Sequence, residues 1–293
     1  MNQPLTLQIE HLNQFYGARQ VLFDIDLHIQ QGMFGLLGRN GAGKTTLMKT
    51  LVTLLPVRKG EVRIDGVLIK QVNKIREMVG YLPQEFTMYG SMTVKGAMEY
   101  LALLSELPHA TIKRRVPELL DKVNLVEHQH KKVKALSGGM KRRLGIAQAL
   151  LHDPKLLIVD EPTAGLDPEE RVRFRNLLSE LAEERIVILS THIVGDIEAT
   201  CEHIAIMHEG RLLFTGTVQQ LLQAAAGKVY TVTVSRDQVQ LWKQGYTVTG
   251  MMMQGNSCEL RLLSDAPINE AASIVEPNIE DAYMWQLGLH QGG

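Results

Sequence analysis

Four apolar runs in this chain end abruptly in polar residues, and this pattern predicts strands of a parallel sheet. Residues 33–37, 156–159 and 186–189 carry no polar side chain, and the run 78–82 carries only a tyrosine hydroxyl. Continuous apolar character is typical of strands that are buried on both faces. Because ligands of open α/β sheets bind beyond the carboxyl ends of the strands, the polar residues that follow these runs are candidates for one common site.

Two other patterns occur before residue 137. In residues 1–32 and 61–69 apolar and polar side chains alternate, which predicts an antiparallel β layer beside the parallel sheet. Between about residues 86 and 137 apolar positions recur at helical spacing instead. Thr93 is placed to cap a helix that runs to Leu104, and in the next helical stretch Pro117 predicts a kink or a new start.

The pattern changes again after Thr217 and predicts a small second domain. Strands are expected at 229–234, near 246–250 and at 259–263, with helical segments at 238–243 and 279–285 and a turn at Gly255–Asn256. We therefore expect one domain at 1–225, with its helical subdomain at about 86–137, and a C-terminal α+β domain at 226–293. The run Met251–Met253 is adaptable apolar surface, expected to pack in the core or against a second chain.

The loop after the first apolar run has a complete phosphate-binding pattern. Residues 38–45 read GRNGAGKT, preceded by a predicted strand and followed by a predicted helix. Glycines let backbone N–H groups face a phosphate chain, and the positive end of the helix dipole adds to this. Lys44 is placed to meet the β and γ phosphates, and the Thr45 hydroxyl to ligate Mg²⁺. The alternative is a glycine-rich turn with an incidental lysine, which the flanking strand and helix disfavour.

Asp160 and Glu161 follow the second apolar run together. Two adjacent acids are costly inside a core, so we expect them at the carboxyl edge of the sheet. Asp160 is then the Mg²⁺ partner and Glu161 the general base that orients a water molecule. An apolar run that ends in two acids is an ordinary strand end when it stands alone.

Two further strand ends and one helix start bring polar groups to the same region. Gln84 offers an amide to the metal and the water, and His192 a hydrogen bond to the γ-phosphate. Ser137-Gly138-Gly139 precedes a basic amphipathic stretch and forms a second anion-binding helix N-terminus. Singly, these are a loop glutamine, a surface histidine and a flexible N-cap.

In this order the segments resemble the ATP-binding cassette of ABC transporters, over about residues 5–220. The resemblance assigns a Walker A loop at 38–45, a Q-loop at Gln84, a signature LSGGM at 136–140, a Walker B strand that ends in Asp160-Glu161, a D-loop at 165–167 and an H-loop at His192. It implies an α/β fold: a P-loop NTPase (RecA-like) core with a parallel sheet, an antiparallel β layer, a helical subdomain and a small C-terminal α+β extension. It also implies that two cassettes enclose two ATP molecules head to tail, each signature covering the nucleotide of the other chain.

The expected site residues follow from the motifs and the resemblance. The catalytic residues are Glu161, His192, Gln84 and Lys44, and the metal ligands are Thr45, Gln84 and Asp160. The nucleotide-binding residues are Tyr16, Gly38, Asn40, Gly41, Ala42, Gly43, Lys44, Thr45, Thr46, Ser137, Gly138, Gly139 and Asp167.

Three of the expected positions leave alternatives open. Tyr16 resembles the adenine-stacking residue of the family, but it could also cap the edge of a core. Asp167 is an expected contact across the dimer, with a simple turn before Pro168 as the alternative. Arg39 departs from the proline of many members and adds a cation with no assigned purpose.

Composition adds mainly exclusions. The chain has 293 residues, 31 basic and 32 acidic, and a net charge of −1, so no broad basic field argues for nucleic acid. The two cysteines, Cys201 and Cys258, lie far apart without metal-ligand spacing, and we expect buried thiols in a reducing compartment. Residues 1–5 lack the features of a signal peptide, and no apolar run is long enough to cross a bilayer. A transporter role therefore calls for separate membrane subunits.

The sequence thus predicts an ATPase subunit that uses ATP and Mg²⁺, pairs with a second cassette and drives a separate permease from the cytoplasmic face of the membrane. For Phe86, Met88 and Tyr89, after the Q-loop, a permease-docking groove and packing between the lobes are both open. The short C-terminal extension and LSGGMKRR resemble exporter ATPases of the ABC-2 type. An importer ATPase is the main alternative, followed by a soluble ABC protein and a small-molecule kinase.

Overall fold

The computed structural model describes residues 4–268 and 272–291 and divides the chain into two compact units. The first unit comprises residues 1–201 and 207–212, and the second comprises 202–206 and 213–293. The second unit begins before the boundary at 225/226 that the sequence predicted, because β10 (Arg211–Thr217) and α8 (Val218–Ala224) fall largely within it.

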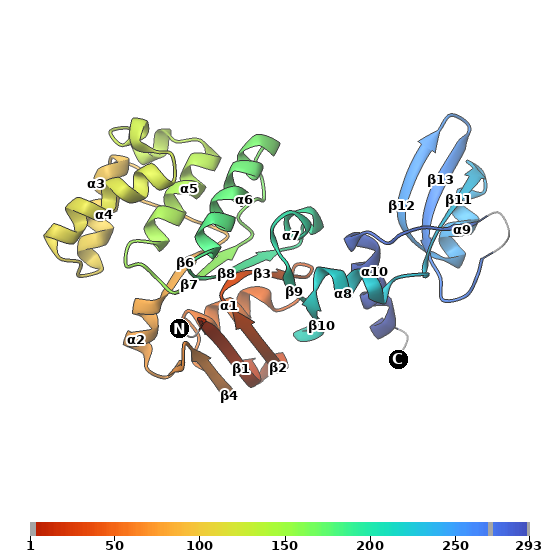
Figure 1. Ribbon diagram of the computed structural model, residues 1–293, viewed down its shortest axis with the longest axis horizontal. Coiled ribbons are helices and arrows are strands. Elements are labelled where there is room, and N and C mark those ends of the chain that lie inside the picture. Colours follow the sequence, from red (N-terminus) through yellow and green to blue (C-terminus); the bar gives the residue numbers. More distant parts are fainter. Residues whose placement is uncertain (1–3, 269–271, 292–293) are drawn as a thin grey trace. The chain divides into compact units, whose positions relative to one another are not determined.

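Four parallel strands form the centre of the first unit, in the order β3 (Gly32–Leu37), β8 (Ile186–Thr191), β7 (Leu156–Asp160) and β6 (Val79–Leu82). All five residues of β7 and all six of β8 are buried, which accounts for the uninterrupted apolar character of residues 156–159 and 186–189 within them. The parallel sheet predicted from the four apolar runs is confirmed. Their carboxyl ends lie at one edge, close to the start of α1 (Lys44–Leu51) (Figure 1).

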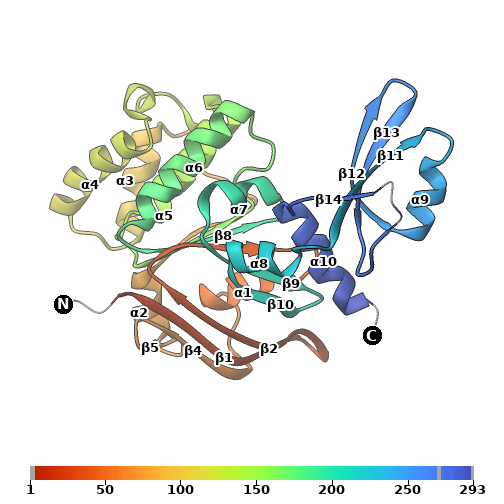
Figure 2. The same ribbon diagram turned by 45° about the vertical axis from the view of Figure 1, so that its right-hand side comes forward.

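The predicted antiparallel layer is a four-stranded sheet in the order β2-β1-β4-β5. Its strands are β1 (Thr6–Tyr16), β2 (Arg19–Gln30), β4 (Lys59–Ile64) and β5 (Val67–Leu68), and α2 (Val72–Met78) follows. In β2, buried and exposed positions alternate from Ile25 onward, so one face of the sheet packs on the core. Figure 2 shows this sheet, drawn in red-brown, below the parallel strands.

The helical subdomain contains α3 (Val94–Leu104), α4 (His109–Lys122) and α5 (Gly138–Ala149), which gather apart from the antiparallel sheet in both views (Figures 1 and 2). Thr93 caps α3, as predicted, by accepting a hydrogen bond from Gly96 N. The new start predicted at Pro117 is wrong, because α4 continues through this residue. We attribute this to the buried apolar face of α4, which outweighs the loss of one backbone hydrogen bond.

Two more helices complete the first unit. α6 (Pro168–Ala182) begins directly after the predicted D-loop, and α7 (Val194–Thr200) follows β8. Short 3₁₀ turns at Val126–His128 and Val133–Ala135 connect α4 to α5. β9 (His203–His208) is divided between the two units, with residues 203–206 in the second and 207–208 in the first.

The second unit has a sheet in the order β12-β13-β11-β14, close to the strand pattern expected from the sequence. Its elements are β11 (Val229–Ser235), α9 (Val239–Gly245), β12 (Thr247–Gln254), β13 (Ser257–Leu263), β14 (Ser273–Ile274) and α10 (Ile279–Gln291). Its core includes Val232, Val234, Cys258, Leu260 and Leu262. Buried Asp281 fixes α10 to this sheet through an ion pair with Arg261 at 2.6 Å.

The structure decides two further expectations. Cys201 and Cys258 are free and buried, as predicted, and burial raises the pKa of the Cys201 thiol to about 12. The core position predicted as one option for Met251–Met253 is wrong, because β12 is an edge strand and these side chains are about half exposed. Packing of this run against a second chain stays a prediction.

Candidate active site

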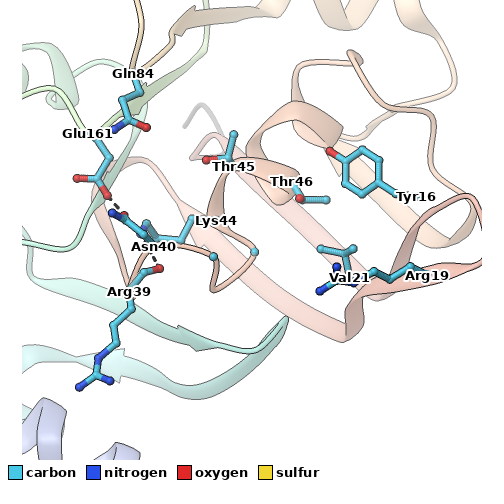
Figure 3. Close-up of a pocket in the computed structure, with 12 residues that line it drawn as sticks. Tyr16, Arg19, Val21, Arg39, Asn40, Lys44, Thr45, Thr46, Gln84 and Glu161 are labelled. Atoms are coloured by element: carbon cyan, nitrogen blue, oxygen red, sulfur yellow. Dashed lines mark hydrogen bonds and ion pairs between the residues drawn. The ribbon is translucent and has the colours of Figure 1, made fainter.

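A cavity of about 540 Å³ lies beside the loop that joins β3 to α1 (Figure 3). α1 begins at Lys44, and no side chain in the described part of the chain caps it, so backbone N–H groups at its start are available to an anion. Gly41 and Gly43 have φ angles of +84° and +109°, a conformation that glycine adopts without strain. The cavity is lined by Tyr16, Arg19, Val21, Arg39, Asn40, Gly41, Gly43, Lys44, Thr45, Thr46, Gln84 and Glu161.

The Lys44 side chain is buried at the base of the loop. Its ammonium donates to the carbonyl oxygens of Gly38 and Arg39 and lies 3.2 Å from Glu161 Oε1. Removing a cation from water is costly unless opposite charge compensates it, and Glu161 provides this charge. Figure 3 shows the pair at the end of the cavity that Gln84 also reaches.

Glu161 is held in an uncommon geometry directly after β7. Its φ angle is +48°, a region that costs a non-glycine residue on the order of 1–3 kcal/mol and is most frequent at functional sites. Its backbone N–H donates to Ser190 O at 2.9 Å, and its Oε2 lies 2.7 Å from His192 Nδ1. Its buried Oε1 accepts no hydrogen bond from any described residue, apart from the Lys44 ion pair. Glu161 Oε1 can therefore still accept a hydrogen bond from a ligand.

Asp160 lies beneath the start of α1, at the end of β7. Its Oδ2 accepts a hydrogen bond from Thr45 Oγ1 at 3.2 Å, and its Oδ1 accepts one from Ser190 Oγ at 3.1 Å. Burial raises the pKa of Asp160, and these two hydrogen bonds partly oppose that rise. Burial, followed by the charge of Asp160, also raises the pKa of Tyr81 to about 12.

The oxygen groups near Thr45 have the chemistry that Mg²⁺ requires. They are a hydroxyl on Thr45, a carboxylate on Asp160 and the amide of Gln84, an exposed residue that lines the cavity. Mg²⁺ prefers hard oxygen ligands and is usually bound through one or two carboxylates together with substrate phosphates. These residues therefore supply the oxygen ligands that the Mg²⁺ ion predicted from the sequence would need.

Ser137, Gly138, Gly139 and Asp167 lie elsewhere on the first unit and are absent from the lining of this cavity. Ser137 caps α5 by accepting a hydrogen bond from Met140 N at 3.2 Å, and its side chain is exposed. Asp167 is also exposed and caps α6 through Glu170 N at 2.9 Å. Within one chain, residues of the predicted P-loop line a single cavity together with Tyr16, Gln84 and Glu161. Asp160 contacts Thr45 and His192 contacts Glu161 beside this cavity. The signature residues do not line it.

Some residues of the site were missed by the sequence reasoning. Ser190 binds Asp160, and the signal for it was a polar residue at the end of a buried strand. Arg142 on α5 lies near Asp160, and burial lowers its pKa while Asp160 raises it. Arg19 lines the cavity beside Tyr16, its partner across the β1–β2 hairpin, and only strand register reveals this.

The profile of the ABC transporter family matches residues 22–164. The linearmycin resistance ATP-binding protein LnrL of Bacillus subtilis is 35% identical over 233 residues, which cover 78% of this chain and 75% of that protein. The chain belongs to the ABC transporter ATP-binding proteins. The Nod factor export ATP-binding protein I of Cupriavidus metallidurans is 37% identical, and the match covers 75% of this chain and 74% of that protein. The family resemblance and the P-loop NTPase fold predicted from the sequence are confirmed.

Solved structures agree with this family assignment. The cbiO1 structure from Clostridium perfringens, part of the ABC transporter complex cbiONQ, is 30% identical with a TM-score of 0.70. It covers 75% of this chain, and this chain covers 92% of it. The chain is thus the ATP-binding subunit of an ABC transporter, in a family that hydrolyses ATP to power transport. None of the helices in the described ranges combines the length and the hydropathy of a bilayer-spanning segment.

Proposed function

We propose that two cassettes close on ATP head to tail, and that ATP hydrolysis between them moves a separate permease from the cytoplasmic side of a membrane. The separation of the two anion-binding features carries this proposal. The P-loop cavity and the exposed start of α5 lie apart in one chain, although both present backbone N–H groups suited to phosphate. A second chain that lends its α5 start to the cavity gives both features a function.

The side chains around the cavity support in-line attack of water on the γ-phosphate. When the triphosphate enters, the Lys44 ammonium exchanges its contact with Glu161 for phosphate oxygens. Glu161 is then free to orient the water and accept its proton, and His192 holds the Glu161 carboxylate from the other side. Bound Mg²⁺, held by Thr45, Asp160 and Gln84, would supply charge neutralisation on the phosphates. Gln84, which lines the same cavity as Glu161, is proposed to contact the attacking water as well.

Blocking the start of α5 tests the head-to-tail arrangement. In a Glu161→Gln chain, which is expected to hydrolyse ATP slowly, we expect Mg-ATP to convert monomers into dimers by light scattering. Adding Ser137→Arg, which fills the space before Gly138, is expected to abolish these dimers while each monomer still binds ATP. The matched control is Ser105→Arg, at the exposed end of α3. Dimers that persist with Ser137→Arg, or monomers of the Glu161→Gln chain in saturating Mg-ATP, contradict the proposal.

Tyr16 is proposed to stack on the adenine base. Its ring lines the cavity and is 47% exposed, so it is not covered as a core residue would be. Stacking of a base on an aromatic ring contributes about 1–3 kcal/mol. We therefore expect Tyr16→Ala to weaken ATP binding by about tenfold or more and Tyr16→Phe to leave it nearly unchanged. Titration with a fluorescent adenine nucleotide measures both, and equal affinities for the alanine variant and the unaltered chain would refute the assignment.

A second cavity, of about 640 Å³, supports a docking site for the permease. Phe86 lines it and also packs on α5, where a Cβ added to Gly145 would lie 3.1 Å from its ring. Tyr89 is half exposed and meets the Tyr100 ring edge-on at 5.2 Å. The lining combines apolar side chains such as Leu101 and Leu104 with the cations Lys49 and Arg76 and the carboxylate of Glu85, which suits an amphipathic helix from another subunit.

Export is the proposed direction of transport. One relative is named for Nod factor export and another for linearmycin resistance, and both match about three quarters of this chain. The small C-terminal α+β domain proposed at 226–293 ends in an acidic and aromatic helix, α10. The cbiO1 neighbour shows that the same cassette fold serves other ABC complexes, so the fold alone does not set direction. The architecture of a co-purifying permease decides between export and import.

A further inference from the structure

A buried carboxylate on α7 has no part in the nucleotide site described above. Asp196 has no exposed side-chain area, and its Oδ2 accepts a short hydrogen bond from Thr163 Oγ1. Its Oδ1 lies 3.7 Å from Arg175 Nη1 and accepts no hydrogen bond from any residue in the described ranges. Because an uncompensated buried charge is strongly destabilising, these two contacts make the Asp196 position costly to alter.

Both partners of Asp196 flank the predicted D-loop. Thr163 starts the turn, since its carbonyl oxygen accepts from Leu166 N at 3.1 Å. Arg175 lies on α6, the helix that begins immediately after the loop, and also donates to Gly195 O at 3.2 Å. Asp196 therefore holds the loop that carries Asp167 at both ends. It binds Thr163 where the loop begins, and it pairs with Arg175 on α6, the helix that follows the loop.

The segment that contains Asp196 also contacts Glu161, the proposed general base. His192, four residues before Asp196, lies 2.7 Å from Glu161 Oε2. Between them, Ile193 N donates to Thr191 Oγ1 at 2.9 Å and Asp196 N donates to Ile193 O at 3.1 Å, which fixes the start of α7. Residues 192–196 thus contact Glu161 at one end and Thr163, two residues beyond Glu161, at the other.

We propose that Asp196 and Thr163 are positioning residues that hold the Asp167 loop in register with Glu161 and His192. The inference rests on the proposed function, in which Asp167 faces the second cassette. A loop that drifts relative to Glu161 misaligns the second chain over the γ-phosphate, although the P-loop contacts of the monomer are untouched. The loss then appears in dimer closure and turnover, not in the affinity of one chain for ATP.

Thr163→Val tests this inference because valine matches threonine in shape but lacks the hydroxyl. We expect kcat for ATP hydrolysis to fall about tenfold, as suits the loss of one hydrogen bond to a charged group. In the Glu161→Gln background we expect the ATP-dependent dimer to dissociate about tenfold more readily. The affinity of the monomer for a nucleotide should stay within about twofold of the unaltered chain. The effect then lies in kcat and not in nucleotide affinity.

Two variants separate positioning from general stability. Thr163→Ser restores the hydroxyl and should recover most of the turnover. Thr200→Val removes another α7 hydroxyl, which donates to the backbone oxygen of the same Asp196 at 2.7 Å, and should leave turnover unchanged. If Thr163→Val does not fold, Asp196→Asn takes its place: its neutral amide oxygen is a weaker acceptor for Thr163 and carries no charge facing Arg175, so turnover should fall while nucleotide affinity is kept.

Unchanged turnover and dimerisation in Thr163→Val would overturn the inference, as would equal losses in Thr163→Val and Thr200→Val. If the Glu161→Gln chain itself fails to dimerise, the proposed function fails. The turnover of Thr163→Val against Thr163→Ser in the otherwise unaltered chain then still decides whether the pair holds the Asp167 loop in register with Glu161.

Discussion

Replacing Glu161 with glutamine is expected to slow ATP hydrolysis by on the order of 10²-fold or more while ATP affinity stays close to that of the unaltered chain. Glutamine keeps the size of the side chain and an oxygen for His192 or Lys44, but it cannot accept the proton of the attacking water. The P-loop donors are unchanged, and Lys44 loses a competing carboxylate at 3.2 Å. Steady-state phosphate release and equilibrium nucleotide binding measure the two effects separately.

Glu169→Gln is the matched control. Glu169 lies on α6 and pairs with Arg173 at the surface, where an ion pair contributes at most about 1 kcal/mol. Its substitution should change neither hydrolysis nor ATP binding. Hydrolysis at the normal rate by Glu161→Gln would exclude Glu161 as the base, and a parallel loss of nucleotide affinity would show that its main role is to shape the cavity.

The second large effect is expected at Lys44. Lys44→Met keeps the apolar stem and removes the ammonium, so the Glu161 carboxylate remains near the phosphates without its cation. We expect ATP affinity to fall on the order of 10²-fold, as for truncation of one partner of a buried charge pair. Isothermal titration with Mg-ATP measures the change, and a thermal melt by circular dichroism confirms that the variant is folded.

Lys49→Met provides the control on the same helix. Lys49 lies one and a half turns after Lys44 and lines the 640 Å³ groove instead of the ATP cavity. The isolated chain should therefore bind ATP normally after this substitution. Affinity within threefold of the unaltered chain for Lys44→Met would mean that its ammonium does not face the triphosphate.

Much of the fold could be predicted from patterns of neighbouring residues in the sequence. The helix from Thr93 to Leu104 follows from one cap and one apolar stripe, and both depend on residues close together in sequence. The strands at 156–160 and 186–191 follow from the unbroken apolar runs at 156–159 and 186–189. Pro117 shows the limit of such reasoning, because burial of one face of α4 depends on neighbours that the local sequence does not specify.

The sequence by itself identified the candidate residues for the chemistry, because Lys44, Asp160 and Glu161 belong to motifs with fixed spacing and a required strand or helix beside them. Only the tertiary structure decided what these groups contact. The Lys44–Glu161 pair, the Ser190 hydrogen bond to Asp160 and the Thr163–Asp196 contact join residues 30 to 117 positions apart. Such contacts depend on strand order and on burial in a medium of low polarity, where unpaired charge is unstable, and neither is encoded in a short stretch of chain.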